Sequence, residues 1–201
     1  MSKGCVISSI IGGAFLFGIF LIVMYFVSTY NSMVTLNETA DNKWAQVENQ
    51  YQRRFDLIPN LVEIVKGYAK HESGTFIAVT EARSKVSQIN LSANDLSDPA
   101  KFQQFQNAQD GLSSALSKLM VVVEAYPELK ANENFKKLQD ELAGTENRIA
   151  VERMRFNDEI KSYNVKIKKF PANFIAGMFG FTERPYFEIE EGTEKAPKIE
   201  F

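Results

Sequence analysis

The charged residues that could do chemistry are arginines and glutamates placed within apolar helical patterns. Arg54 lies on the flank of the apolar face that a helix over residues 44–68 would present, and Glu146 lies beside the apolar face of a helix over residues 133–170. An arginine taken out of water requires an opposite charge and further hydrogen bonds. We therefore predict an ion pair between Arg54 and Glu146 that joins the two helices.

The heights of these two residues along their helices favour the pairing. With a rise of about 1.5 Å per residue, the partners lie roughly 39 and 36 Å from the membrane ends of the two helices. The same reasoning predicts a second pair, Glu48 with Arg153, closer to the membrane. Asn157 and Asn164 continue the polar stripe that holds Arg153. We expect both ion pairs to be structural.

A catalytic use of these charges is the alternative, and the inventory of residue types argues against it. The chain contains one histidine, His71, and one cysteine, Cys5, and it has neither a phosphate-binding glycine loop nor a nucleophile beside a base in a known motif. A zinc site would need carboxylates for most of its ligands, and the Glu-x-x-His motif of di-metal bundles is absent. We predict no catalytic residue, metal or cofactor, and a protein that is not an enzyme.

An uncharged run precedes the helices that carry these groups. No Asp, Glu, Lys, Arg or His lies between Lys3 and Glu38, and residues 6–28 are almost wholly apolar. About 20 such residues span a bilayer as a helix. A cleaved signal peptide would have a shorter apolar core and a small-residue cleavage site. We therefore predict a short tail at 1–5 and a retained transmembrane anchor at 6–28.

Small residues recur four positions apart within this anchor. One series is Gly4, Ser8 and Gly12, and the other is Ala14 and Gly18. This spacing allows two helix backbones to approach closely in a bilayer. We expect the anchor to pack against a second copy of itself through these residues.

The distribution of basic residues beside the anchor bears on its orientation. Lys3 lies on the short side, whereas the first basic residue on the long side is Lys43, which follows Glu38 and Asp41. Because lysine and arginine favour the cytoplasmic side, we expect a cytoplasmic N-terminus and a domain outside the cytoplasm.

Residues 30–170 carry four amphipathic helical patterns joined by short connections. Apolar residues recur at spacings of three and four, and no strand-type alternation occurs. Asp98-Pro99 predicts a helix start, and Pro127 ends that helix. Pro59 lies within the first pattern, where it should bend the helix without ending it. We predict an all-α fold in which the transmembrane helix continues into an antiparallel four-helix bundle with long helices.

The length of the predicted helices returns the chain to the membrane. The first helix extends roughly 60 Å from the membrane and the fourth returns by roughly 57 Å. The segment that follows, 171–186, is aromatic and too short to span. It either lies in the headgroup region or folds back over the open end of the bundle. The residues predicted at the interface are Phe174, Ile175, Met178, Phe179 and Phe181.

The last predicted segment is an acidic tail over residues 187–201. From residue 188 onward it contains five glutamates and two lysines with almost no apolar pattern. Such a composition is typical of a disordered or loosely extended chain.

A set of motifs in register resembles one known family. They are Trp44, Arg53-Arg54-Phe-Asp-Leu-Ile-Pro-Asn-Leu-Val62, Val65-Lys-Gly-Tyr-Ala69, Tyr126-Pro-Glu-Leu-Lys-Ala-Asn132, Thr145-Glu-Asn-Arg-Ile-Ala150, Phe156-Asn157, Tyr163-Asn164 and Phe170-Pro171. They are similar to the LemA family, and the match covers nearly all of residues 44–187. The resemblance implies a single-pass bacterial membrane protein with a helical-bundle domain and no established enzymatic activity. It also implies a cytoplasmic domain, the opposite of the orientation that the charges favour.

These features predict a membrane-anchored scaffold rather than an enzyme. We expect a homo-oligomer, or a complex with another membrane protein, assembled through the anchor and the bundle. The alternative is a lipid-binding or membrane-shaping module acting through residues 174–181, with membrane lipids as partners. The net charge of −2, with acids and bases interspersed, argues against nucleic acid as a partner.

Overall fold

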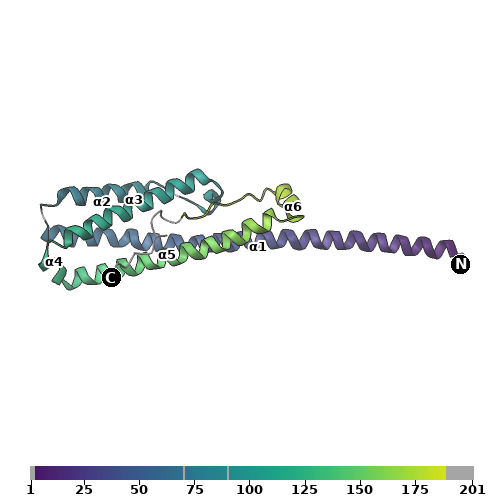
Figure 1. The fold of residues 1–201 in the computed structure, drawn as a ribbon, viewed down its shortest axis with the longest axis horizontal. Helices are drawn as coiled ribbons and strands as arrows, with labels where there is room; N and C mark the ends of the chain where they lie inside the picture. Colours follow the sequence, from purple (N-terminus) through teal and green to yellow (C-terminus); the bar gives the residue numbers. More distant parts are fainter. Residues whose placement is uncertain (1–2, 70, 90, 189–201) are drawn as a thin grey trace, which may run out of the picture.

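The computed structural model describes residues 3–69, 71–89 and 91–188, which are largely helical and contain no strand. The first helix, α1, spans Lys3–Tyr68 without interruption and has 66 residues. At 1.5 Å per residue it is about 99 Å long. It extends from the apolar N-terminal region to the far end of the domain (Figure 1). Pro59 lies inside α1, and the helix continues past it to Tyr68.

The remaining elements follow in chain order. They are α2 (Ser73–Ser87), the 3-10 turn η1 (Ala93–Ser97), α3 (Pro99–Val123), α4 (Pro127–Ala131), α5 (Glu133–Lys168) and α6 (Ala172–Phe179). The predicted start of α3 is confirmed, because the Asp98 side chain accepts hydrogen bonds from the backbone N–H groups of Ala100 and Lys101. Pro127 begins the short helix α4 instead of only ending α3, since proline suits the first position of a helix.

The helices associate as two close pairs. α1 packs along α5, and α2 packs along α3 (Figure 1). At the far end of the domain, the Asn132 side chain donates a hydrogen bond of 3.0 Å to the Tyr68 hydroxyl. At the other end, the ring of Phe179 in α6 lies 4.6 Å from the ring of Tyr30. α5 therefore returns along α1 toward its apolar part.

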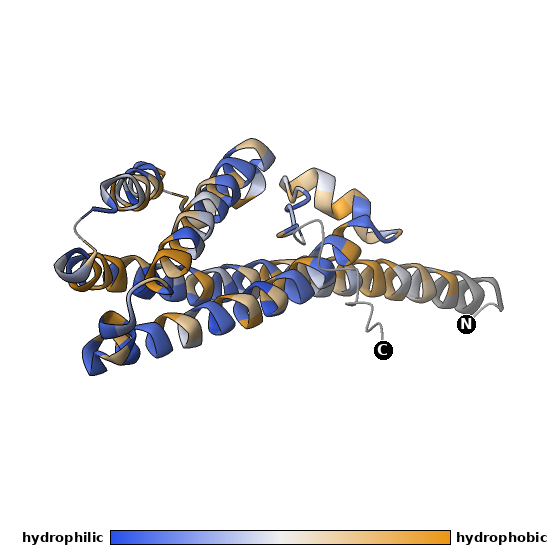
Figure 2. Ribbon diagram, turned by 60° about the vertical axis from the view of Figure 1, so that its left-hand side comes forward, coloured by the Kyte–Doolittle hydropathy of each residue, from blue (hydrophilic) through white to orange (hydrophobic). Residues whose placement is uncertain are grey.

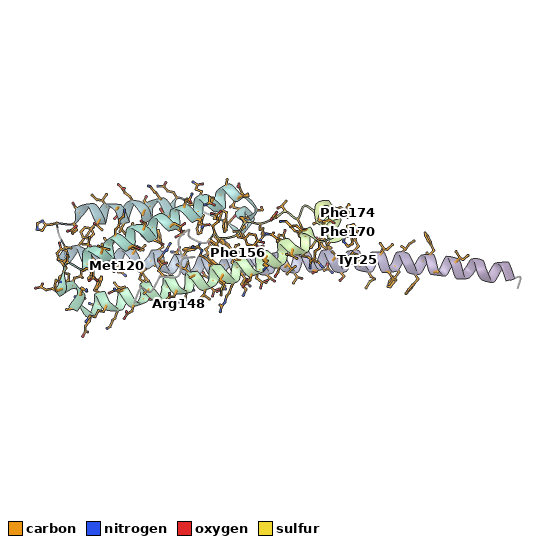
Figure 3. All side chains as sticks on the ribbon, viewed as in Figure 1. Tyr25, Met120, Arg148, Phe156, Phe170 and Phe174 are labelled. Atoms are coloured by element: carbon orange, nitrogen blue, oxygen red, sulfur yellow. The ribbon has the colours of Figure 1, made fainter. Side chains whose placement is uncertain are left out.

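Three buried clusters form the core along the length of α1. The cluster farthest from the N-terminus is mainly aliphatic and includes Val65 and Leu119. The middle cluster is aromatic and includes Trp44 and Phe156, while the third surrounds Met33 beside α6. Phe156 is drawn inside the bundle in Figure 3, whereas Tyr25, Phe170 and Phe174 gather where α1 leaves it.

The N-terminal part of α1 extends beyond the rest of the domain. Hydrophobic residues dominate it (Figure 2), and its most apolar 18-residue window has a mean hydropathy of 2.3 with none of it buried. It is the one helix among the described residues that is long and apolar enough to cross a membrane. The same residue types that fill the core elsewhere are here exposed, as expected of a segment whose solvent is lipid.

The C-terminal part of the described chain differs from the predicted boundary between the aromatic segment and the acidic tail. Residues 181–188, here called the C-terminal segment, are extended and lie against the bundle. Phe187, assigned from the sequence to the tail, is only 3% exposed, because it enters the aromatic cluster of the middle core. The remainder of the predicted tail, 189–201, lies outside the described residues.

Candidate functional site

Arg54 is the centre of a buried polar site that joins three helices. Its side chain is 2% exposed, and its Nη1 donates hydrogen bonds to Glu146 Oε1 at 3.0 Å and to Ser113 Oγ at 2.8 Å. Its Nη2 donates to the side chain and the backbone carbonyl of Gln109. The structure thus brings together the two residues of the first predicted ion pair, and it adds Gln109 and Ser113 of α3, which the sequence reasoning missed.

The structure does not bring together the residues of the second predicted pair. Glu48 is exposed, and no salt bridge between it and Arg153 occurs in the described part of the chain. Arg153 instead donates a hydrogen bond of 3.0 Å to the backbone carbonyl of Glu188, and its guanidinium lies 4.6 Å from the centre of the Phe187 ring. The reason is the C-terminal segment, which occupies the space that Arg153 faces.

The chemistry of the Arg54 site is that of a structural centre. The guanidinium donors on Nη1 and Nη2 are used within the protein, so they stabilise the neighbouring helices instead of presenting charge to a substrate. Burial raises the pKa of the nearby Tyr51 phenol above its ordinary value. Across residues 3–69, 71–89 and 91–188, no group of three or more histidine, cysteine or acidic residues could hold a metal ion.

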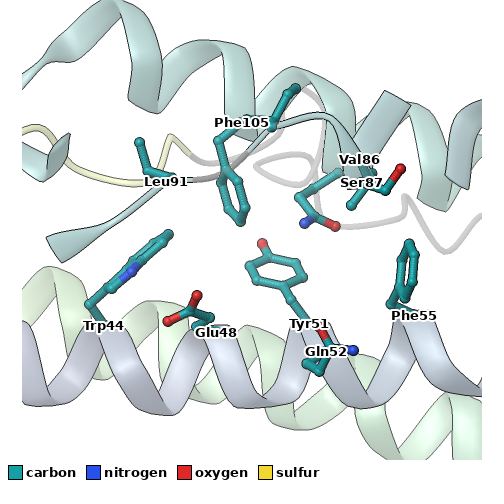
Figure 4. A pocket seen from close by; sticks show the side chains of 11 residues that line it. Trp44, Glu48, Tyr51, Gln52, Phe55, Val86, Ser87, Leu91 and Phe105 are labelled. Carbon is teal, nitrogen blue, oxygen red and sulfur yellow. The ribbon is translucent and has the colours of Figure 1, made fainter. Parts of the chain in front are cut away.

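An open pocket of about 310 Å³ lies between α1, the end of α2 and α3 (Figure 4). Aromatic side chains from α1 and α3 line it, including Trp44, Tyr51 and Phe105, and the carboxylate of Glu48 lies at its edge. The indole N–H of Trp44 is buried and has no hydrogen-bond partner among the described residues. The volume is at the lower limit of small-molecule sites. The pocket reflects the space between the two helix pairs, which large aromatic side chains only partly fill.

Two asparagines of α5 bind the backbone of the C-terminal segment. Asn164 donates to the carbonyl of Arg184 at 2.8 Å and accepts from its N–H at 3.0 Å. Asn157 makes the same two bonds to Phe187, at 3.0 and 2.9 Å. Seven residues of helix rise about 10.5 Å and three residues of extended chain span about 10 Å, so the two spacings match.

The C-terminal segment is also held by α1 and α3. Gln106 of α3 exchanges two hydrogen bonds of 3.3 Å with the backbone of Glu188. The guanidinium of Arg184 forms a salt bridge of 2.6 Å with Asp41 of α1 and lies over the ring of Tyr163. The seven-residue spacing of Asn157 and Asn164 was visible in the sequence, but nothing in their surroundings indicated a backbone partner.

The predicted membrane-interface residues divide between two faces of α6. Ile175 is buried against α1, and the rings of Phe179 and Phe181 lie within 6 Å of the ring of Tyr30. Phe174 and Met178 are exposed, and Phe174 also lines an open groove beside α1. α6 therefore covers the end of the bundle with one face and presents large apolar side chains to the surroundings with the other.

The small residues of the anchor lie on α1 in the part that extends beyond the bundle. No other helix among residues 3–69, 71–89 and 91–188 lies beside Gly12, Ala14 and Gly18, and a Cβ added at Gly12 or Gly18 would meet nothing within 4 Å of it in that part of the chain. Gly4 and Ser8 belong to the same helix.

Comparison with known proteins places the described domain in a family. The model of the LemA family matches residues 43–201, which is most of the chain. The chain belongs to the LemA family. The prediction drawn from the sequence motifs is thereby confirmed.

Three named relatives of this LemA-family chain come from three bacteria. It is 30% identical to Magnetosome protein MamQ 2 of Paramagnetospirillum magneticum, over 84% of this chain and 69% of the relative. It is 30% identical to Magnetosome protein MamQ of Magnetospirillum gryphiswaldense, over 79% of this chain and 64% of that protein. Protein LemA of Metamycoplasma hominis is 25% identical over 87% of this chain and 74% of its own length.

The LemA match includes the polar contacts described above except for Asp41, the partner of Arg184, which lies two residues before the match begins. It begins at residue 43 and contains the Arg54 site, the two backbone-binding asparagines of α5, the C-terminal segment and α6. The exposed apolar part of α1 precedes it. The family match therefore covers most of the packed helices, whose core also includes Met33 and Ala40 before residue 43, and the exposed apolar part of α1 lies outside it.

Proposed function

We propose that this protein is a membrane-anchored, non-enzymatic scaffold of the LemA type. The observation that supports this most is the continuity of α1, which is one helix from the exposed apolar residues to the far end of the bundle. A helix without a break carries no hinge between anchor and domain. The bundle therefore stands on the membrane at a fixed direction and presents its surface at a defined height.

The proposed architecture is an antiparallel bundle of four helices, α1, α2, α3 and α5, based at the membrane. The contacts of α6 with α1 support the position of the base, because α6 packs beside Phe26 and Tyr30, at the end of the apolar stretch. From there to Tyr68 the bundle extends about 60 Å. In this arrangement partners would meet the far end of the domain well away from the bilayer.

Self-assembly is the second part of the proposal. Gly12, Ala14 and Gly18 leave the backbone of α1 open to close approach by another helix, and within the described part of the chain no helix lies there. In lipid such surfaces associate through van der Waals packing. A second copy of the chain is the partner we propose, with another membrane protein as the alternative.

The mass of the assembly tests the scaffold. Full-length protein extracted in mild detergent is expected to form a defined oligomer, while the domain lacking residues 1–29 is expected to be a monomer. Replacing Gly12 and Gly18 by leucine should dissociate the full-length oligomer without loss of helix content. Monomers of full-length protein at all concentrations would contradict self-assembly.

A lipid-binding or membrane-shaping role is the second candidate, and the exposed face of α6 favours it. Phe170, Phe174 and Met178 are among the most exposed large apolar residues of the domain. Aromatic side chains on such a face enter the headgroup region of a bilayer. The domain lacking residues 1–29 should then bind liposomes, and replacing Phe174, Phe179 and Phe181 by serine should abolish the binding.

The proposed location is the bacterial inner membrane, with a single span and the domain outside the cytoplasm. The basic residues that flank the span support this orientation, since Lys3 stands alone on the short side and acidic residues come first on the long side. A Cys5→Ser/Val121→Cys variant tests it in spheroplasts. Labelling by a membrane-impermeant maleimide is expected, and labelling only after lysis would place the domain in the cytoplasm.

A further inference from the structure

An open apolar groove of about 470 Å³ separates α6 from the N-terminal part of α1. Its walls are almost purely apolar and come from both helices, as Leu21, Ile22 and Tyr25 of α1 and Pro171, Phe174 and Ile175 of α6. Tyr25, Phe170 and Phe174 mark this place in Figure 3. The groove lies within the same apolar stretch of α1 whose exposed surface requires lipid as its solvent.

We propose that this groove binds one acyl chain of a phospholipid, whose phosphate lies beside Lys169. The inference rests on the proposed membrane anchoring and goes further, because it assigns one lipid to one site instead of a general lipid surface.

The size and the lining of the groove select an acyl chain. A helix about 10 Å in diameter fills roughly 420 Å³ per turn, so the groove holds no more than one turn of a partner helix. A flexible hydrocarbon chain fits such an irregular space without breaking a backbone hydrogen-bond pattern. The groove is open, and several of its wall residues on α1 belong to the exposed apolar stretch that a bilayer would surround.

A basic residue that could bind the headgroup is close in the sequence to the groove wall. Lys169 lies in the turn between α5 and α6, two residues before Pro171 of the groove wall. Its ammonium makes no ion pair with any residue that the structure describes, whereas the neighbouring Lys168 is paired with Glu183. A free lysine at a membrane surface attracts phosphate, and it favours anionic lipids.

The test is native mass spectrometry of the full-length protein after reconstitution in nanodiscs of phosphatidylcholine and phosphatidylglycerol and release into mild detergent. One retained phospholipid per chain is expected. Ile22→Ser should lower the ratio of lipid-bound to lipid-free chains by about ten-fold, which corresponds to about 1.4 kcal/mol and to the loss of one large apolar contact. Leu16→Ser is the matched control, because both side chains are 68% exposed but only Ile22 lines the groove.

Two further variants separate the acyl chain from the headgroup. Phe174→Ser should lose the lipid as Ile22→Ser does, whereas Phe15→Ser, on the anchor away from α6, should retain it. Lys169→Gln should keep a bound lipid and lose the preference for phosphatidylglycerol over phosphatidylcholine.

The outcomes distinguish this site from the anchoring itself. A chain that enters nanodiscs but retains no lipid, or that retains it equally in Ile22→Ser and Leu16→Ser, overturns the lipid site and leaves the anchor in place. A chain that does not enter nanodiscs at all overturns the membrane-anchoring proposal. A bound lipid whose headgroup preference is unchanged by Lys169→Gln overturns the assignment of Lys169.

Discussion

The two halves of the bundle are held together by different chemistry. In the half far from the membrane, aliphatic residues such as Val65 and Leu119 form the core, and the ion pair of Arg53 with Glu141 lies on the surface. In the half nearer the apolar part of α1, asparagine and glutamine side chains bind the backbone of the C-terminal segment, and Arg184 of that segment pairs with Asp41 of α1.

The difference follows from what covers the α1–α5 pair in each half. In the far half the cover is the α2–α3 pair, whose helices satisfy their own backbone groups, so apolar contacts suffice. Nearer the membrane part of the cover is an extended segment, whose N–H and C=O groups have no partners within the segment. Buried backbone groups require hydrogen bonds, and Asn157 and Asn164 supply them in pairs. Polar residues in this core are therefore a consequence of extended chain.

Removal of the buried charge of Arg54, which lies between the aliphatic and the aromatic cluster, should lower the stability of the domain more than any other substitution considered below. Arg54→Ala leaves Glu146 and Gln109 without their common donor, and we expect it to lower the free energy of unfolding by about 3–5 kcal/mol. Arg53→Ala, at the neighbouring exposed pair, should cost less than about 1 kcal/mol. Chemical denaturation of both variants in detergent measures the two values. Equal values would remove the contrast between a buried and an exposed pair.

Glu146, the partner of Arg54, allows a second comparison between a buried ion pair and an exposed charge. Glu146→Ala should destabilise the domain by about 1–3 kcal/mol, because it leaves a buried donor unsatisfied. The exposed Glu133 serves as the control, with a loss of about 0.5 kcal/mol or less on replacement by alanine. The comparison of the two unfolding midpoints is the measurement, and similar midpoints would show that the buried pair is not a stabilising centre.

The contribution of the C-terminal segment depends on Phe187. Phe187→Ala empties a place in the aromatic cluster and should cost about 3 kcal/mol, at the lower end for buried phenylalanine because the segment can shift into the space. The adjacent Tyr186 is exposed, and Tyr186→Ala should change stability by about 0.5 kcal/mol or less. Thermal unfolding monitored by circular dichroism distinguishes the two. If Phe187→Ala leaves the unfolding temperature unchanged, the C-terminal segment contributes little to the stability of the membrane-proximal half.

The backbone-binding asparagines should have a smaller effect, confined to one half of the bundle. Asn164→Ala leaves the N–H and C=O groups of Arg184 without partners and should cost about 1–3 kcal/mol. Asn147→Ala, on the exposed face of the same helix, is the control. Hydrogen exchange should increase at the amides of Arg184 and Phe187 and remain unchanged around Leu119. If Asn164→Ala accelerates amide hydrogen exchange equally in both halves, the two cores are not stabilised independently of each other.

The smallest expected effect concerns the turn that begins α3. A hydrogen bond from Lys101, with others from Ser92, lowers the pKa of Asp95 from 3.8 to about 2. Because the folded pKa is below the unfolded one, this carboxylate stabilises the turn above pH 4, and the stabilisation is lost as the pH falls from about 4 to about 2. An NMR titration should give a midpoint near 2, and Lys101→Ala should raise it. A midpoint near 3.8 in the parent chain would contradict the assignment.

The helices and their ends were largely predictable from the sequence because the information is local. Apolar spacing marks the faces of α1, α3 and α5, and Asp98 and Asn132 mark helix starts through side chains that cap them. The Arg54–Glu146 contact was also accessible, since an arginine on an apolar flank demands a partner and the helix rise fixes where that partner lies.

The C-terminal segment could not be predicted in the same way. Residues 181–188 have neither helical nor strand periodicity, and their hydrogen bonds go to side chains distant in the sequence. The incorrect pairing of Glu48 with Arg153 has the same cause. The contacts of Arg153 with the C-terminal segment could not be foreseen, so the sequence offered only an acidic residue at a similar position along the neighbouring helix as its partner. Long-range contacts of irregular chain are absent from local patterns.

The most direct test of the account is thiol labelling along the membrane-proximal face in nanodiscs, which leave both sides of the bilayer accessible to a water-soluble maleimide. In a Cys5→Ser background, Met178→Cys on α6 is compared with Val121→Cys at the far half of the bundle, because these side chains are 70% and 72% exposed in the isolated chain. The account predicts rapid labelling of Val121→Cys and strong protection of Met178→Cys that detergent removes. Equal labelling of both positions in nanodiscs would contradict a bundle that stands on the membrane with α6 at its base.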